Sequence, residues 1–110
     1  MSIVPKEKIV SYLLNSAHPD GASKAQFFAA LGCNAEYWQV LADALRKVPS
    51  LHDVTATVES VHGVKYIVDG RIETPAGRSP WVRTVWIVDH GQTAPRLVTA
   101  YPQQPENGDD

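Results

Sequence analysis

The spacing of apolar residues changes from a helical to a strand period after Pro49, and this change limits the folds that the chain can adopt. Before Pro49, apolar residues recur every three or four positions, as in amphipathic helices. After it, the segment DVTATVES (53–60) alternates apolar and polar residues, which is typical of a strand with one buried face. Helices followed by strands, without alternation between the two, indicate an α+β domain.

Three helices are expected in the first half of the chain. Proline is suited to the first turn of a helix, whereas the stretch HPDG (18–21) interrupts one, because Pro19 restricts the residue before it and Gly21 permits a turn. Ser and Asn accept hydrogen bonds from the first free N–H groups of a helix. The expected helices are one starting near Pro5 with Ile9, Tyr12 and Leu13 on one side, one over 23–32 capped by Ser23, and one over 35–48 capped by Asn34.

Four strands are expected in the second half, separated by turns rich in Gly and Pro. They are DVTATVES (53–60), GVKYIVDG (63–70), VRTVWIVD (82–89) and PRLVTAYP (95–102). The predicted fold is therefore α+β, with about three N-terminal helices packed on one face of a four-stranded antiparallel sheet. We expect residues 1–102 to form a single domain and the acidic tail 103–110 to be disordered.

Composition excludes several classes of protein. The chain has 110 residues, of which 44% are hydrophobic, and no apolar run is long enough to span a membrane. A single cysteine, Cys33, excludes an internal disulfide, and no Cys/His spacing predicts a metal site. The N-terminus lacks the layout of a signal peptide. We therefore expect a cytoplasmic protein without metal, cofactor or membrane association, although secretion by a route without a cleaved signal stays open.

Alternation along the strands predicts which side chains share a face of the sheet. The face covered by helices is expected to carry mostly aliphatic residues: Val54, Ala56, Val58, Val64, Tyr66, Val68, Val85, Ile87, Val98 and Ala100. The open face is then expected to carry Thr55, Thr57, Glu59, Lys65, Thr84, Trp86, Thr99 and Tyr101. A shift of one residue in strand register would reverse these assignments.

The expected open face combines hydroxyl groups, a cation and two aromatic rings. Aromatic rings stack on nucleobases, and lysine and hydroxyl groups hold phosphate, so this set of side chains suits RNA. The same residue types are also good strand formers, which is the alternative interpretation of each of them. The net charge of −2 argues against binding polyanions over the whole surface, whereas residues 61–101 carry five basic and three acidic side chains.

Three stretches together resemble a small bacterial domain family of unassigned function. They are HPDGASKAQFF (18–28), GVKYIVDG (63–70) and TVWIVDHGQTAPRLVTAYP (84–102), which resemble the patterns HPxGxxKAxFF, GxKYxVDG and TVW followed by PRLVTAYP. That family is similar in turn to the barnase–EndoU–colicin–RelE superfamily of ribonuclease toxins, in which helices precede an antiparallel sheet whose open face cleaves RNA. The resemblance covers about residues 5–102 and implies a toxin with a cognate antitoxin or immunity protein.

The resemblance implies a metal-independent ribonuclease that cleaves tRNA or mRNA by general acid–base transesterification. Such a site needs a proton acceptor, a proton donor and groups that stabilise a charged phosphorane. The expected catalytic residues are His18, Lys24, Lys65, Thr84, Thr99 and Tyr101, and the expected substrate-binding residues are Trp86, Arg78 and Arg83. The glutamate–arginine–histidine trio of barnase has no evident counterpart in this sequence.

Two other functions stay open at this point. The same face could serve a binding module without catalytic activity, an antitoxin or immunity-type protein that grips a protein partner with its exposed aromatic residues. It could also belong to a nucleic-acid-binding domain that lacks an acid–base pair. Sequence alone does not separate these alternatives.

Overall fold

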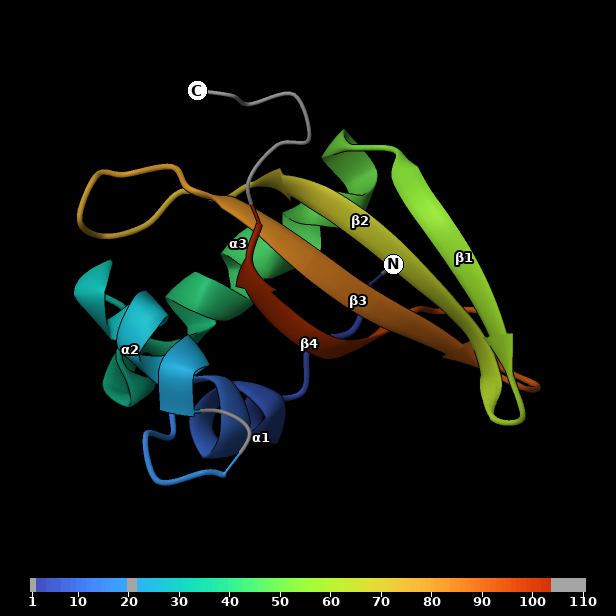
Figure 1. Ribbon diagram of the computed structural model, residues 1–110, viewed down its shortest axis with the longest axis horizontal. Coiled ribbons are helices and arrows are strands. Elements are labelled where there is room, and N and C mark those ends of the chain that lie inside the picture. The colour runs from blue at the N-terminus through green and yellow to red at the C-terminus, as the bar shows by residue number, and fades with distance from the viewer. Residues whose placement is uncertain (1, 20–21, 104–110) are drawn as a thin grey trace.

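The helices come first in the chain and the strands follow, as the computed structural model shows for residues 2–19 and 22–103 (Figure 1). The predicted α+β class is therefore confirmed. The elements are α1 (Lys6–Lys8), the π-helical turn η1 (Ile9–Leu13), α2 (Ala22–Ala30), the 3-10 turn η2 (Ala35–Tyr37), α3 (Trp38–Leu51), β1 (Val54–Ser60), β2 (Gly63–Arg71), β3 (Trp81–Asp89) and β4 (Arg96–Pro102). Except for Gln103, the tail predicted to be disordered lies outside the described residues.

The ends of the helices follow the predicted caps only in part. Asn34 caps the third helical segment, since its side-chain oxygen accepts a hydrogen bond of 3.0 Å from the backbone N–H of Tyr37. Ser23 lies inside α2 and not at its cap. The third helix was expected to end at Val48 but continues through Pro49 to residue 51. Proline removes one backbone donor, yet the helix continues past it, and its last turn closes with a hydrogen bond from the N–H of His52 to the carbonyl of Val48.

The sheet is antiparallel throughout, with the strand order β1-β2-β3-β4. Figure 1 shows α3 behind the sheet, whereas α1 and α2 lie beside the β4 edge. Leu41 and Leu45 of α3 pack in one core with Phe28 of α2 and with the sheet residues Val68 and Trp86. No helix in the described part of the chain combines the length and the apolar character needed to cross a membrane.

Two irregularities in strand pairing decide which side chains face α3. Between Val54 and Ala56 the register of β1 against β2 shifts by one residue, and a second shift separates the pairs Val85–Thr99 and Trp86–Leu97. Each bulge inserts one extra residue into a strand and exchanges the two faces beyond it. The face turned away from α3, called the open face below, carries Ala56, Val58, Lys65, Ile67, Asp69, Arg71, Trp81, Arg83, Val85, Ile87, Arg96, Thr99 and Tyr101.

The prediction for the two faces was wrong for β3. Thr84 and Trp86 were expected on the open face but are buried, with exposed fractions of 0% and 1%. Their neighbours show why, because Arg83 and Asp89 alternate with them and a charged side chain is costly to bury. Val85 correspondingly lies on the open face, half-buried, opposite Thr99.

The same expectation failed at other positions. Thr57 and Glu59 pair with Tyr66 and Val64 and so share the side of α3, whereas Ala56 and Val58 lie on the open face. The bulge in β1 is the physical reason, since it reverses the alternation after Val54. The expectation was confirmed for Val68 and Ala100, which are buried.

The buried hydroxyl of Thr84 should be important for stability. It donates to the carbonyl of Val68 at 2.7 Å and accepts the indole N–H of Trp86 at 2.8 Å. We expect Thr84→Val to lower the free energy of unfolding by about 1–3 kcal/mol, because the buried indole N–H loses its acceptor. The matched control Val85→Thr, on the open face, should cost about 0.5 kcal/mol or less. Denaturant unfolding measures both, and equal losses would contradict this assignment of the faces.

Candidate active site at the β4 margin

Four polar or ionisable side chains meet where η1 and α2 lie against β4. The hydroxyl groups of Tyr12 and Thr99 are 3.1 Å apart and hydrogen-bonded. The His18 ring packs edge-on against the Tyr12 ring, with a centroid distance of 4.9 Å, and the Lys24 ammonium lies 5.4 Å from the same ring centroid. Tyr12, His18, Lys24 and Thr99 are called the margin cluster below. Residues 87 positions apart in the chain thus form one polar group.

A tight turn after η1 brings His18 back onto Tyr12. The side-chain oxygen of Asn15 accepts the N–H of Ala17 at 3.0 Å, and its backbone carbonyl accepts the N–H of His18 at 3.1 Å. Asparagine stabilises such turns because its side chain replaces a backbone acceptor. The next helix then places Lys24 in its first turn, from which its ammonium reaches the Tyr12 ring.

An arginine on the neighbouring strand extends this polar region along the open face. Arg83 donates through Nε and Nη2 to the two carboxylate oxygens of Asp69, at 2.8 and 2.9 Å. Tyr101 lies directly opposite Arg83 in the sheet. The hydrogen bond that Arg83 donates to Asp69, more than the smaller contribution of Tyr101, raises the pKa of Arg83 above its usual range. This guanidinium is therefore a fixed positive charge, held in one orientation by a bidentate contact.

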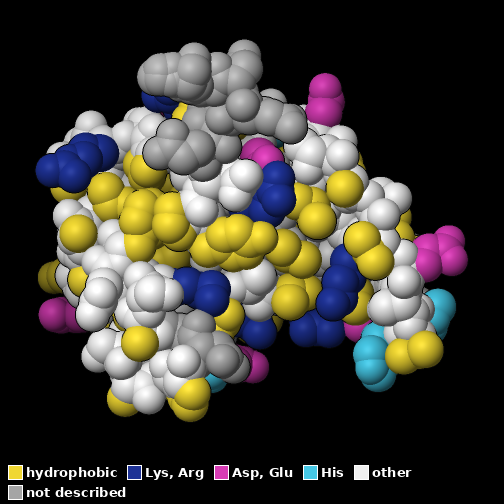
Figure 2. Space-filling model, in the orientation of Figure 1, with side chains coloured by type: hydrophobic (Ala, Val, Ile, Leu, Met, Phe, Trp, Pro, Cys, Tyr) yellow, Lys and Arg dark blue, Asp and Glu magenta, His cyan; other side chains and the backbone are white. Residues whose placement is uncertain are grey.

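The rest of the open face is apolar in the middle and cationic around it. Figure 2 shows a band of hydrophobic side chains across this face, with Lys and Arg side chains beside it. The half-buried residues Ile67 and Val85 lie on this face, and Ile87 beside them is buried. Lys65, Arg71, Arg83 and Arg96 supply positive charge, and the two carboxylates on this side, Asp69 and Asp89, are both paired with arginine. Such a surface suits an anion that also carries apolar groups.

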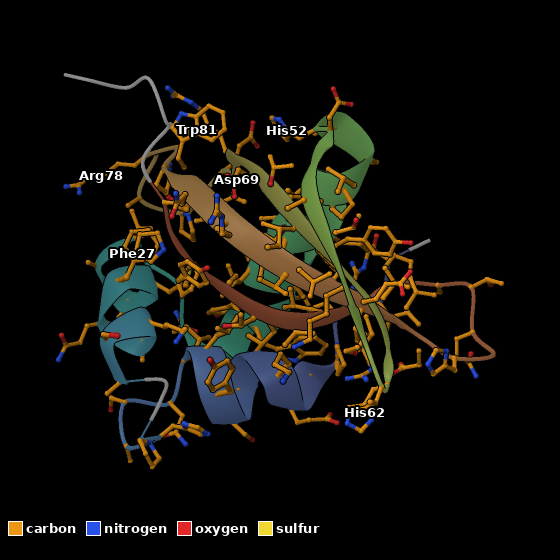
Figure 3. The ribbon with its side chains drawn as sticks, turned by 45° about the vertical axis from the view of Figure 1, so that its right-hand side comes forward. Phe27, His52, His62, Asp69, Arg78 and Trp81 are labelled. Carbon is orange, nitrogen blue, oxygen red and sulfur yellow. The ribbon has the colours of Figure 1, made fainter. Side chains whose placement is uncertain are left out.

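The structure brings some of the predicted site residues together and separates others. His18, Lys24 and Thr99 meet in the margin cluster, and Lys65, Arg83 and Tyr101 share the open face. As described above, the buried residues Thr84 and Trp86 cannot contact a substrate there. Arg78 lies in the exposed loop between β2 and β3, labelled in Figure 3, where its carbonyl accepts the hydroxyl of Thr74.

Sequence reasoning missed two aromatic residues on this side of the molecule. Tyr12 was assigned to the apolar stripe of the first helix, although its hydroxyl bonds to Thr99. Trp81 lies at the start of β3, opposite Arg71, and shares the open face with Arg83. A usable signal for Trp81 was present in the sequence, since a residue two positions from a strand arginine shares its solvent-facing side.

Other kinds of site find less support in the described residues. Across 2–19 and 22–103, no three His, Cys, Asp or Glu side chains gather in a way that could hold a metal ion. Cys33 is buried, and burial raises the pKa of its thiol, which disfavours the nucleophilic thiolate. A cavity of about 240 Å³ next to Pro49, Tyr66 and Trp86 has apolar walls and lies on the α3 side of the sheet.

The fold and the matches to known proteins place the chain among small α+β domains in which helices precede a four-stranded sheet. The model of the family described as "Domain of unknown function (DUF6883)" matches residues 1–104, and the chain belongs to this family. A comparison with curated proteins finds no match. A solved structure described as a contact-dependent growth inhibition toxin–immunity protein complex from Klebsiella pneumoniae 342 contains a chain of similar fold. Its TM-score is 0.75 at 17% identity, over 94% of this chain and 95% of that chain.

The hydrogen bond inside the margin cluster can be tested directly. Tyr12→Phe should lower the free energy of unfolding by about 0.5–1.5 kcal/mol, because it removes one part-buried neutral hydrogen bond and keeps the ring. Tyr37→Phe is the matched control, since Tyr37 is 61% exposed, and should leave stability unchanged. Denaturant unfolding compares the two, and a Tyr12→Phe variant as stable as the wild type would show that the bond contributes nothing.

Proposed function

We propose that the protein is a metal-independent endoribonuclease toxin that cleaves tRNA or mRNA at the margin cluster and binds it along the open face. The observation that carries this proposal is the meeting of three segments at Tyr12, with His18 and Lys24 against its ring and Thr99 at its hydroxyl. A proton-transfer group, a cation and hydroxyl donors are the groups that such chemistry requires. The adjoining basic surface supplies the contacts for a polyanion.

Each residue has a role that its position allows. His18 accepts the proton of the RNA 2′-hydroxyl, since imidazole exchanges protons near neutral pH. Lys24 and Arg83 stabilise negative charge on the phosphate, and the hydroxyl groups of Thr99 and Tyr101 donate to its oxygens. Tyr12 is a positioning residue, because its hydrogen bond orients the hydroxyl of Thr99. Lys65, farther along the open face, holds a neighbouring phosphate.

The reaction uses the nucleophile that RNA itself carries. The 2′-oxygen forms a bond to phosphorus as its proton passes to His18, and the bond from phosphorus to the 5′-oxygen breaks. The departing 5′-oxygen takes a proton from the protonated imidazole. The products are a 2′,3′-cyclic phosphate and a 5′-hydroxyl, and no external oxidant, reductant or water is consumed in this step.

Two likenesses support the toxin assignment. The solved structure of similar fold is described as a toxin–immunity protein complex. The sequence motifs resemble the barnase–EndoU–colicin–RelE ribonuclease toxins, whose open sheet face cleaves RNA. A protein of this kind needs a cognate antitoxin or immunity protein in the cell that makes it, and the proposal includes that partner.

RNA cleavage by the purified protein tests the proposal. His18→Ala and Lys24→Ala should each slow cleavage of total RNA by roughly 10²–10⁴-fold, the usual contribution of an acid–base group or of a charge that stabilises the transition state. His62→Ala and Lys47→Ala are matched controls, because both side chains are exposed and lie outside the margin cluster. Single-turnover rates with an end-labelled RNA measure the difference.

Two further assays can contradict the proposed mechanism. An RNA with a 2′-deoxy sugar at the cleavage position should resist the wild type, since the nucleophile is missing. Induced expression should arrest bacterial growth, and His18→Ala should restore it. Cleavage that survives both His18→Ala and the 2′-deoxy sugar would overturn the mechanism, and a wild type that neither cleaves RNA nor arrests growth would overturn the function.

The exposed strand β1 favours a second candidate function, an immunity-type or antitoxin module that binds a protein. Six of its seven residues are exposed, including Val54 at 48% and Val58 at 50%, and Val61 in the following turn is 83% exposed. Within the described residues β1 pairs only with β2, so its outer edge can accept a strand from another protein. The edge of β4, in contrast, is bridged by Ile3.

This second function has its own expected outcome. Co-expression with the product of the adjoining gene should yield a complex that Val58→Lys weakens, because a charge on an edge strand opposes pairing. Thr93→Lys, in the exposed turn before β4, is the matched control. Healthy growth on expression, no cleavage of RNA and a complex sensitive to Val58→Lys would favour this candidate over the ribonuclease, whereas a complex equally strong with both variants would remove β1 as the interface.

A further inference from the structure

Trp81 forms a cluster of rings and charge at the end of the open face that lies beyond Arg83. The Arg71 guanidinium carbon lies 5.6 Å from the Trp81 ring centroid, and the His52 ring lies 6.1 Å away at an interplanar angle of 57°. Figure 3 shows Trp81 and His52 near each other at one end of the sheet. Arg71 is exposed, and Trp81 is half-buried. The neighbours of the Trp81 ring thus include the planar guanidinium of Arg71 and not apolar side chains alone.

The backbone is shaped to admit this cluster. A Cβ atom at Gly70 would lie 2.4 Å from Cδ2 and 2.8 Å from Nε2 of the His52 ring. A Cβ atom does not come this close to a non-bonded atom in proteins. The glycine at position 70 therefore leaves the space in which the His52 ring packs against β2. His52 in turn supports Trp81 from the side. Trp81 is therefore contacted by Arg71 of β2 and by His52, which lies between α3 and β1.

The cluster lies in line with the proposed active site. Arg71 pairs with Trp81 across the sheet, Asp69 with Arg83, and Ile67 with Val85, and each pair is one step further along the same face. Val85 lies opposite Thr99 of the margin cluster. Trp81 and Val85 are four positions apart in β3, which corresponds to roughly 14 Å along an extended strand. A nucleotide at Trp81 is thus a neighbour of the cleaved one and not the cleaved nucleotide itself.

We infer that Trp81 and Arg71 form a nucleobase-binding subsite for single-stranded RNA, which accepts a base next to the cleavage position. This inference rests on the proposed ribonuclease function and adds the strandedness of its substrate. Bases stack on indole and guanidinium planes only when they are unpaired and turned outward. The guanidinium of Arg71 already lies over the indole, so it offers its outer plane to a base and its N–H groups to the adjoining phosphate.

Binding of a non-cleavable oligonucleotide tests this subsite. The probe is a fluorescent single-stranded RNA hexamer with 2′-O-methyl sugars, which lacks the nucleophile, and anisotropy measures its affinity. Trp81→Leu should weaken binding about 5- to 100-fold, the range for loss of one aromatic–base stack, whereas Trp81→Phe should keep most of the affinity. Tyr37→Leu is the matched control, since it removes an exposed aromatic ring outside the sheet and should leave affinity unchanged.

The dependence of binding affinity on salt concentration and on the presence of nucleobases distinguishes stacking from electrostatic attraction. Trp81→Leu should leave the salt dependence of binding unchanged, whereas Arg71→Gln should reduce the slope of log K against log salt by about 0.7, as expected for one phosphate contact on a single strand. The effect of Trp81→Leu should disappear with a hexamer of the same charge that lacks its bases. If Trp81→Leu fails to fold, Trp81→Phe and the hexamer without bases test the same stack.

The possible results separate this inference from the proposed function. A Trp81→Leu variant that folds and binds the hexamer within twofold of the wild type would overturn the subsite, even if RNA cleavage continues. A loss of affinity that persists with the hexamer without bases would also overturn it. Weakened binding by Trp81→Leu, in a protein that cleaves no RNA, would support the subsite and remove the ribonuclease.

Discussion

The burial of Trp86 is the constraint on which the rest of the structure depends. Its indole lies among residues of α3 and the sheet, and its N–H group must have an acceptor there because an unpaired buried donor is costly. Thr84 supplies that acceptor from the same strand, and its own hydroxyl donates a hydrogen bond to the carbonyl of Val68 in β2. Because Thr84 and Trp86 lie in the core and side chains alternate along β3, Arg83 and Trp81 lie on the opposite, open face. The composition of the open face thus follows from how the indole N–H of Trp86 finds its acceptor in the core.

The order and type of the elements could be predicted from the sequence, whereas the faces of the sheet could not. The change of period after Pro49 correctly separates helices from strands, and Asn34 correctly marks a helix start. The two bulges leave no reliable mark in the residues around them. The bulge in β1 moves Ala56 and Val58 to the opposite face, so the prediction based on alternation fails there. In β3, which pairs with β2 without a bulge, Thr84 was assigned to the wrong face, whereas Thr99 and Tyr101 of β4 lie on the open face as expected.

The candidate site was predictable in its parts but not as a group. His18, Lys24 and Thr99 carry suitable chemistry, and the sequence motifs pointed to them. They meet because the π-helical turn η1 and the turn at Asn15 direct the chain back toward β4. Neither turn has a clear pattern in a single sequence. Tyr12 was missed for the same reason, because a tyrosine on an apolar stripe is usually part of the core. The proposed function still rests on this cluster and not on the faces first assigned to β3.

The two lateral edges of the sheet differ in whether another segment of the chain covers them, which bears on where a further strand can pair. Ile3 joins β4 through backbone hydrogen bonds at Pro95 and Leu97, while β1 keeps its outer edge exposed. A sheet with two available edges can add molecules without end, as in fibrils. A sheet with one available edge can add a single partner, after which growth stops. If another strand pairs with this sheet, the seven residues of β1 offer a free outer edge, whereas the segment at Ile3 already occupies the start of β4.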